Sequence, residues 1–223
     1  MIGIIGAMDS ETQGLKNLIC DKKTEVISGI EFVCGKLNGK DVVCAKCNPG
    51  KVNSALCAQA MILKYKPDVI INSGVAGSLS SDLGIYDVAI ARNCVQHDFD
   101  TSPLGSPVGM IDGLDKIYFE CDTHAIETLQ KACENEKYML GTIASGDVFV
   151  SGKEMKDRIT KNFNAIACEM EGASIAHVCY VNGVKFGILR VISDGGDEVD
   201  FGTFVKETSK KSIEIMRKFV ELY

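Results

Sequence analysis

Three acidic residues stand where apolar, strand-like runs end in polar sequence. Glu11 comes shortly after the opening apolar run, and Glu171 comes shortly after the run 165–168. Asp194 ends the apolar run 186–192. A buried carboxylate costs free energy unless it has a partner or a chemical task, so such acids are poor core residues and good candidates for acid–base chemistry. Because chemistry in α/β sheets sits at the carboxyl ends of strands, the sequence points to a site built there.

The same residues also have structural explanations. Glu11 and Glu171 fall in the first turns of expected helices, where acidic side chains stabilise the helix macrodipole without any catalytic role. Arg190 lies in the same expected strand as Asp194 and could hold it in a purely structural ion pair. Glu169, two residues before Glu171, is a further acid of the same segment. Residue types and spacing alone leave both explanations open.

Two glycine-containing segments follow expected strands. The segment 73–78 follows the apolar strand 68–72, and such a loop can bring backbone amides close to a ligand. It has neither the lysine of a phosphate-binding loop nor the G-x-G-x-x-G spacing of a dinucleotide fold, and a plain tight turn explains it equally well. The segment 145–150 places Phe149 after a glycine, where its ring could stack on a flat ligand or pack in the core.

Strands and helices are expected to alternate through most of the chain. The β-type runs predict strands at 1–7, 24–27, 31–37, 41–47, 68–72, 87–95, 138–145, 165–168 and 185–193. Helical spacing and capping signals predict helices at 9–20, 50–65, 121–136, 151–159, 171–181 and 201–223. This alternation favours a three-layer α/β/α sandwich with a central mixed, mainly parallel β-sheet, folded as a single domain over residues 1–223. The segment 101–113, with two prolines and three glycines, is expected to be a loop or a lid.

Composition argues against several classes of function. The net charge of −6 disfavours a nucleic-acid surface, and the sequence has no uninterrupted apolar run of about 18 residues that would predict a membrane span. The N-terminus is apolar but lacks the basic leader of a secretory signal. The ten cysteines are therefore expected to be reduced thiols in the cytoplasm, packed as small hydrophobic residues.

Patterns that could bind a metal are weak in this sequence. Cys44 and Cys47 have C-x-x-C spacing, but residues three apart on the expected strand point to opposite faces of the sheet. His97 and Asp98 have no second histidine nearby in the sequence. A nucleophilic serine motif of the G-x-S-x-G type is also missing from the sequence. We expect no metal and no cofactor.

In their order and spacing, the motifs are specific to one family. The chain resembles the 5'-methylthioadenosine/S-adenosylhomocysteine nucleosidases, within the nucleoside phosphorylase superfamily, almost from end to end. The matching motifs are Gly3-Ile4-Ile5-Gly6-Ala7-Met8 with Glu11, Gly50-Lys51-Val52-Asn53, Pro67 through Gly74, Ser145-Gly146-Asp147, Glu169-Met170-Glu171, Ala176-His177-Val178-Cys179, and Arg190 through Asp194.

The resemblance implies a metal-free hydrolase, usually a homodimer. It would cleave the N-glycosidic bond of 5'-methylthioadenosine and S-adenosylhomocysteine, and of 5'-deoxyadenosine, releasing adenine in methionine salvage. Carried over by motif, Glu11 is the base that activates water, Asp194 the acid that protonates adenine at N7, and Glu171 the ligand of the ribose hydroxyls. The other substrate-binding residues that it implies are Met8, Val75, Phe149, Val150, Met170, Arg190, Ser193 and Phe201.

Several of these residues receive separate tasks from the resemblance. Phe149 would stack on the purine, and the backbone at Val150 would recognise the adenine edge. Met170 would pack on the ribose, and Arg190 would orient the sugar-binding carboxylate and the water. Glu169 receives no task and is expected to be less central than its neighbours.

The sequence departs from the family pattern at three places, one of which is the stretch between Asp194 and Phe201, shorter here than in many members. Val75 stands where some members have serine, which removes one polar contact, and the segment 100–105 differs from the common form, so the preference among thionucleosides is open. A purine nucleoside phosphorylase, a futalosine hydrolase and a nucleoside-binding sensor without catalysis are the alternatives. A phosphorylase would need cations for phosphate, and neither 74–78 nor the first turn of the first expected helix has one. The presence of all three acids argues against a sensor.

Overall fold

One mixed sheet of ten strands runs through the chain. The structure is a computed structural model, and it describes residues 1–196 and 198–223. The strands are β1 (Ile2–Gly6), β2 (Cys20–Ile27), β3 (Ile30–Leu37), β4 (Lys40–Lys46), β5 (Val69–Ser78), β6 (Val88–Gln96), β7 (Tyr118–Glu120), β8 (Tyr138–Ser145), β9 (Ala165–Glu169) and β10 (Lys185–Asp194). The helices are α1 (Asp9–Leu18), α2 (Lys51–Tyr65), α3 (Thr123–Ala132), α4 (Lys153–Phe163), α5 (Gly172–Asn182) and α6 (Glu198–Leu222), with a 3₁₀ turn η1 at Ser102–Leu104.

The sheet contains two groups of parallel strands. In the first group β1 lies between β4 and β5, and β5 also pairs with β10. The second group is β6, β8 and β9. Antiparallel pairing of β10 with β6 and of β5 with β9 joins the two groups, so these five strands close on themselves. β3 and β2 extend the sheet beyond β4 as an antiparallel meander.

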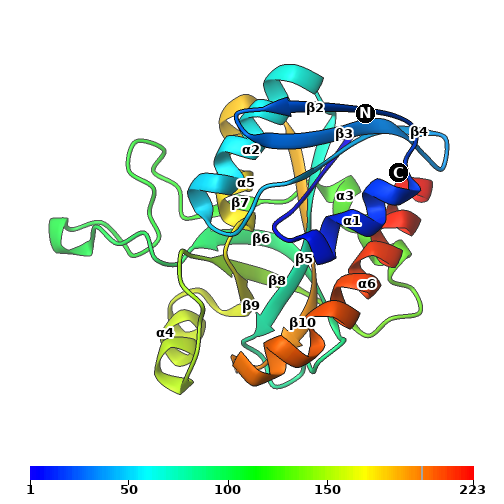
Figure 1. Cartoon of the computed structure of the whole chain (residues 1–223). Helices are drawn as coiled ribbons and strands as arrows, with labels where there is room; N and C mark the ends of the chain where they lie inside the picture. The colour runs from blue at the N-terminus through cyan, green and yellow to red at the C-terminus, as the bar shows by residue number, and fades with distance from the viewer. Residues whose placement is uncertain (197) are drawn as a thin grey trace.

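Helices cover both faces of the sheet (Figure 1). Residues of α2 and α5 share one core cluster with Ile5 of β1. Residues of α1, α3 and α6 share another cluster with Ile4 of the same strand. Consecutive strand residues thus face opposite helical layers, as the period of a β-strand requires. These layers confirm the three-layer α/β/α architecture with a central mixed sheet.

Three differences from the sequence-based expectation concern the pairing of strands. The expected loop at 73–78 is the second half of β5, which pairs with β10 as far as Gly77. The helix expected to reach Cys20 ends at Leu18, and Cys20 begins β2. The strand β7 was not expected and pairs with β6. In each case pairing with a neighbouring strand overrides the local sequence signal.

The segment between β6 and β7 is a loop, as expected, and it projects from the body of the molecule (Figure 1). Its 3₁₀ turn leaves the side chain of Leu104 86% exposed. A large apolar side chain on a projecting loop is typical of a contact surface.

The cysteines pack as expected. All ten are free thiols, and eight of them are buried. Cys44 and Cys47 belong to core clusters on opposite faces of the sheet, as their spacing predicts. Within residues 1–196 and 198–223, no cluster of three or more His, Cys, Asp or Glu side chains could hold a metal ion. No helix in this described part is long and apolar enough to cross a membrane.

Candidate active site

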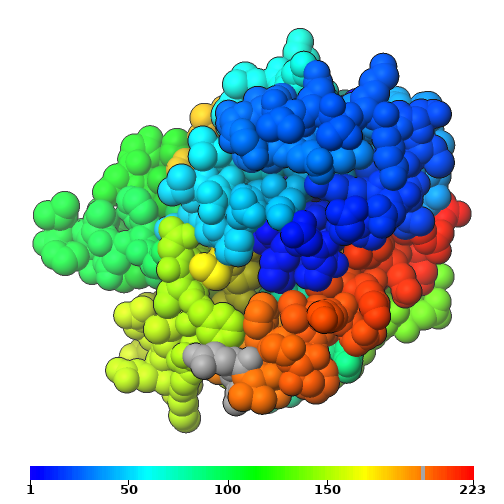
Figure 2. All heavy atoms as spheres, in the orientation of Figure 1, coloured from blue at the N-terminus to red at the C-terminus, as the bar shows by residue number. Residues whose placement is uncertain are grey.

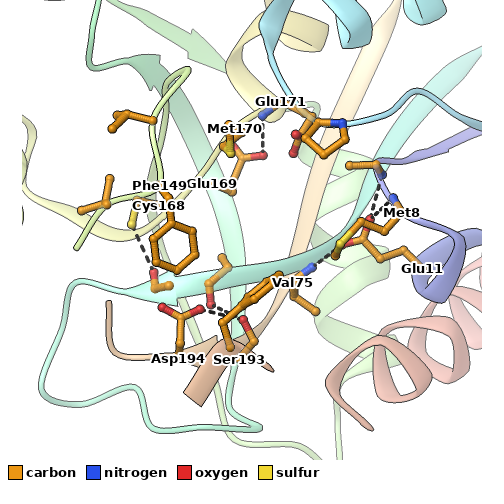
Figure 3. Close-up of a pocket in the computed structure, with 17 residues that line it drawn as sticks. Met8, Glu11, Val75, Phe149, Cys168, Glu169, Met170, Glu171, Ser193 and Asp194 are labelled. Atoms are coloured by element: carbon orange, nitrogen blue, oxygen red, sulfur yellow. Dashed lines mark hydrogen bonds between the residues drawn. The ribbon is translucent and has the colours of Figure 1, made fainter. Parts of the chain in front are cut away.

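A pocket lies where the carboxyl ends of several strands meet (Figure 3). The walls come from the β1–α1 turn, β5, the segment after β8, the β9–α5 turn, the end of β10 and the start of α6. The lining residues are Ala7, Met8, Glu11, Pro49, Val75, Ala76, Gly77, Val148, Phe149, Val150, Cys168, Glu169, Met170, Glu171, Ser193, Asp194 and Phe201.

Glu11 binds the backbone of the β1–α1 turn and of β5 with its carboxylate. Oε2 accepts the N–H of Ala7 at 2.7 Å and that of Met8 at 2.9 Å, and Oε1 accepts the N–H of Val75 at 3.0 Å. The bond from Met8 is the reach-back bond of a capping box, so the helix-start explanation is correct in part. Burial raises the pKa of Glu11, against the charge of Arg190 and the backbone hydrogen bonds. The raised pKa makes this pocket-lining carboxylate a stronger base.

Gly74 allows the Glu11 carboxylate to lie against β5. A Cβ at this position would overlap Glu11 Oε1 and would lie 3.2 Å from Arg190 Nη1. The sequence suggested that this segment could present backbone amides to a ligand, but the N–H of Val75 is bonded to Glu11 instead. The glycine is therefore explained by the close approach of two charged side chains.

Arg190 is buried behind the pocket wall and pairs with Glu169. Its Nη2 contacts Glu169 Oε2 and Asn72 Oδ1, and lies 3.8 Å from Glu171 Oε2. The interpretation that Arg190 forms a structural ion pair with Asp194, which the sequence left open, is therefore wrong. The charge of Arg190 supports the β9–α5 turn rather than the acid at the end of β10.

Glu169 organises the β9–α5 turn. Its carboxylate accepts Ser145 Oγ–H, the N–H of Glu171 at 3.0 Å and the N–H of Gly172 at 2.8 Å. Burial by itself would raise the pKa of Glu169, but Arg190 and the hydrogen bonds outweigh burial and lower it. The expectation that Glu169 is less central is wrong, because this residue is the ionised partner of Arg190 and fixes the turn that holds Glu171.

Burial of the Glu171 carboxyl group favours its protonated form. Burial and the negative charge of Glu169 together raise its pKa to about 8, although Arg190 and the N–H of Gly50 oppose the rise. That N–H donates to Glu171 Oε1 at 2.9 Å from the loop before α2. At neutral pH the Glu171 carboxyl can therefore both donate and accept a hydrogen bond.

The loop that supplies Gly50 is fixed by bonds to two other loops. The N–H of Lys51 donates to Asp147 Oδ1 at 2.7 Å, and Lys51 Nζ lies 2.6 Å from Asp98 Oδ1. Asp98 Oδ2 in turn accepts the N–H of Asp147 at 2.9 Å. Segments that follow β4, β6 and β8 are thus joined next to Glu171.

Asp194 lies at the opposite end of the pocket from the β1–α1 turn (Figure 3). Its Oδ2 accepts Ser193 Oγ–H at 2.8 Å, and its Oδ1 accepts the N–H of Gly196 at 2.8 Å. Phe149 and Phe201 border this end, with ring centroids 5.7 Å apart and ring planes at 76°. Because aromatic faces stack on flat rings, this end suits a heterocycle beside an acid.

Comparison with known proteins agrees with this geometry. A family model described as "Phosphorylase superfamily" matches residues 1–221. A 5'-methylthioadenosine/S-adenosylhomocysteine nucleosidase of Staphylococcus aureus (strain bovine RF122 / ET3-1) is 34% identical over 226 residues, which cover 99% of each chain. The chain belongs to the 5'-methylthioadenosine/S-adenosylhomocysteine nucleosidases of this superfamily.

Solved structures extend the similarity to the whole fold. The nucleosidase of Neisseria meningitidis in complex with methylthio-immucillin-A has a TM-score of 0.95 at 31% identity, covering 99% of this chain and 98% of that one. A futalosine hydrolase of Helicobacter pylori has a TM-score of 0.94 at 36% identity, covering 99% of this chain and 97% of that one. The nucleosidase resemblance drawn from the sequence motifs is therefore confirmed.

The structure brings together nearly all the residues that the nucleosidase motifs indicate. Of these residues, Arg190 is the one that does not line the pocket, since it lies behind the wall. Their individual tasks stay predictions. Sequence reasoning gave no role to Asn72, Ser145 and Gly50, which bind Arg190, Glu169 and Glu171. The sequence does carry signals for these residues. Asn72 is a polar residue in an apolar strand, and Ser145 and Gly50 each stand in one of the family motifs.

Replacing Glu171 with Gln should change how stability depends on pH. The folded protein keeps this proton up to about pH 8, whereas the ordinary pKa is 4.5. The folded state therefore binds more protons than the unfolded state in this interval, and stability falls as pH rises. Glu171→Gln should reduce the fall by up to roughly 1.4 kcal/mol per pH unit, measured by urea unfolding at several pH values. Glu154→Gln on the exposed surface of α4 is the control, and an unchanged slope in Glu171→Gln would contradict the assignment.

Proposed function

We propose that this protein hydrolyses the N-glycosidic bond of 5'-methylthioadenosine and S-adenosylhomocysteine, releasing adenine and the 5-substituted ribose. One observation carries the proposal: a single pocket has the buried carboxylates of Glu11 and Asp194 at opposite ends and Glu171 in its wall. The nucleosidase relatives support the same substrate class. The arrangement supplies a base, an acid and a sugar ligand to one bound nucleoside.

Asp194 acts on the leaving group. Adenine is a poor leaving group as an anion, so it must gain a proton as the bond to the sugar breaks. The protonated carboxyl group of Asp194 donates this proton to N7 and becomes the carboxylate, while the Phe149 ring stacks on the purine. Ser193 Oγ and the N–H of Gly196 hold the carboxylate in place. General acid catalysis of this kind contributes about 10²- to 10⁴-fold.

Glu11 acts on the nucleophile. The sugar becomes oxocarbenium-like as the bond to N9 breaks, and the negative carboxylate stabilises the developing positive charge. Glu11 accepts a proton from water, the water oxygen bonds to C1', and the electron pair of the broken bond leaves with the protonated adenine. The three backbone N–H groups on Glu11 fix its orientation.

Water rather than phosphate is the nucleophile in this proposal. None of the described residues that line the pocket is Lys or Arg. The guanidinium of Arg190 behind the wall is already paired with Glu169. A phosphate anion would therefore lie near the carboxylates of Glu11 and Glu169 without a free cation, which is electrostatically unfavourable.

A futalosine is a second candidate substrate, because the similar Helicobacter pylori structure is named as a futalosine hydrolase. The bond to be cleaved is also N-glycosidic, so Glu11 and a base-directed acid would serve it in the same way. A direct comparison of rates on the two kinds of substrate separates these candidates.

We infer that two copies of the chain associate. Apolar side chains are exposed on α2 at Val52, Leu56 and Leu63, and on α5 at Tyr180. The helices α2 and α5 pack against each other, and Figure 2 shows the cyan surface of α2 beside the projecting green loop that exposes Leu104. An exposed apolar surface of this kind is typical of an interface. A second copy of the same chain is the proposed partner.

We also propose that residues 1–223 fold as one domain and that the protein works in the cytoplasm. The single sheet, in which β1 and β10 both pair with β5, supports one domain. Ten free thiols in the structure support a reducing compartment.

Adenine release should be independent of phosphate. We expect purified protein to release adenine from 5'-methylthioadenosine and S-adenosylhomocysteine at the same rate in phosphate-free buffer and with excess phosphate, as followed by chromatography of the base. Futalosine is tested in parallel. Strict dependence on phosphate would contradict the hydrolase, and a rate on futalosine far above that on both thionucleosides would reassign the substrate.

Asp194→Asn should bind the nucleoside without turning it over. We expect kcat to fall by about 10²- to 10⁴-fold because the acid is lost. Calorimetry should show nucleoside affinity within a few-fold of the wild type. Asp157→Asn, which removes an exposed carboxylate on α4, is the matched control. An Asp194→Asn enzyme with unchanged turnover would show that another group protonates the purine.

Charge placed on α2 should separate the two copies. Val52→Glu with Leu63→Glu puts two carboxylates on side chains that are each about 70% exposed in the single chain. Light scattering should give the mass of two chains for the wild type and of one chain for the variant. Val26→Glu, at an equally exposed valine on β2, should stay dimeric. A wild-type protein with the mass of one chain would refute the inference.

A further inference from the structure

One peptide group connects the proposed acid to a helix outside the pocket. The N–H of Gly196 donates to Asp194 Oδ1 at 2.8 Å. The carbonyl of the same peptide group belongs to Gly195, and it accepts a hydrogen bond from the ammonium group of Lys156 on α4. The ammonium, the peptide dipole and the carboxylate are therefore joined in one chain of hydrogen bonds.

The stem of Lys156 contacts the same turn. Gly196 has a φ of +81°, a conformation that favours glycine. A Cβ at Gly196 would lie 3.0 Å from Lys156 Cδ and 3.1 Å from the carbonyl oxygen of Val150. The turn thus lies against both the lysine stem and the segment after β8 that lines the pocket. Lys156 contacts it through its methylenes as well as through its charge.

The charge of Lys156 also acts inside the pocket. Cys168 lines the pocket and lies close to Asp194. Burial and the charges of Asp194 and Glu169 together raise the pKa of the Cys168 thiol to about 12, whereas the charge of Lys156 acts to lower it. The ammonium is thus near enough to affect groups around the acid. Hydrogen bonds in such a chain polarise and strengthen one another.

We propose that Lys156 is a positioning residue for the acid: through the Gly195–Gly196 peptide it holds the Asp194 carboxyl group in the orientation from which its acid form protonates the purine. This inference rests on the proposed function and adds a residue outside the pocket lining to it. Lys156 does not touch the substrate. Its loss should therefore slow the chemical step more than it weakens binding.

Lys156→Met tests this role because it keeps the apolar stem and removes the ammonium. We expect kcat to fall by roughly 10- to 100-fold, since misplacing a catalytic group by about 1 Å has effects of this size. KM should change by less than threefold, and the midpoint of thermal unfolding should stay the same. Lys156→Arg keeps a donor and a charge, and should recover at least a third of the wild-type kcat.

Lys153→Met is the matched control from the same helix. Its ammonium pairs with Asp157 at 2.5 Å on the exposed side of α4, and its side chain is 86% exposed. We expect wild-type kcat and KM for this variant. The proposal is overturned if Lys156→Met keeps kcat within twofold, if its KM rises while kcat stays the same, or if Lys156→Arg is as slow as Lys156→Met. A wild-type protein without hydrolase activity would refute the proposed function instead, so the two failures are distinct.

Discussion

One buried guanidinium, that of Arg190, is shared by three buried carboxylates, and the chemistry of the pocket depends on that imbalance. Full ionisation of Glu11, Glu169 and Glu171 would place two uncompensated negative charges in a region of low dielectric. The protein avoids this cost by giving the three carboxyl groups different pKa values. Glu169 takes the ion pair and stays ionised, whereas the pKa of Glu171 rises to about 8 and that of Glu11 is raised by burial. The protonated Glu171 therefore lies near the base Glu11. This arrangement can bind a neutral sugar, and it disfavours an anionic nucleophile.

The carboxylates are held mainly by the backbone. Glu11 accepts N–H groups from the β1–α1 turn and from β5, and Glu169 accepts N–H groups at the start of α5. These bonds satisfy donors that a helix start or a strand would otherwise leave open. The structural and the chemical explanations of an acid at a helix start are therefore not alternatives here. The bonds that cap the helix also fix the direction in which the carboxylate faces the pocket.

Much of the fold and the site follows from sequence patterns, but the partners within the site do not. The alternation of apolar runs predicts the layers, and the acids at strand ends predict where chemistry occurs. The pattern does not say which strands become neighbours when the sheet closes. Only the pairing of β9 with β8 and β5 brings Glu169 next to Ser145 and Arg190. The same closure extends β5 through 73–78, where local glycine content indicates a turn.

The two ends of the pocket, which we propose bind the sugar and the purine, are held in place in different ways, and this separates two requirements of the proposed reaction. At the sugar end, buried charges and strand backbone hold Glu11 and Glu171, so these groups cannot shift without exposing unpaired charge. At the purine end, Asp194 depends on a short turn, and Phe149 beside it is 39% exposed. A flat base can enter between partly exposed rings at low cost, whereas the sugar carbon must meet groups that are already fixed. Because the turn that holds Asp194 is not part of the sheet, another element must fix its position. The helix α4 lies against this turn through Lys156.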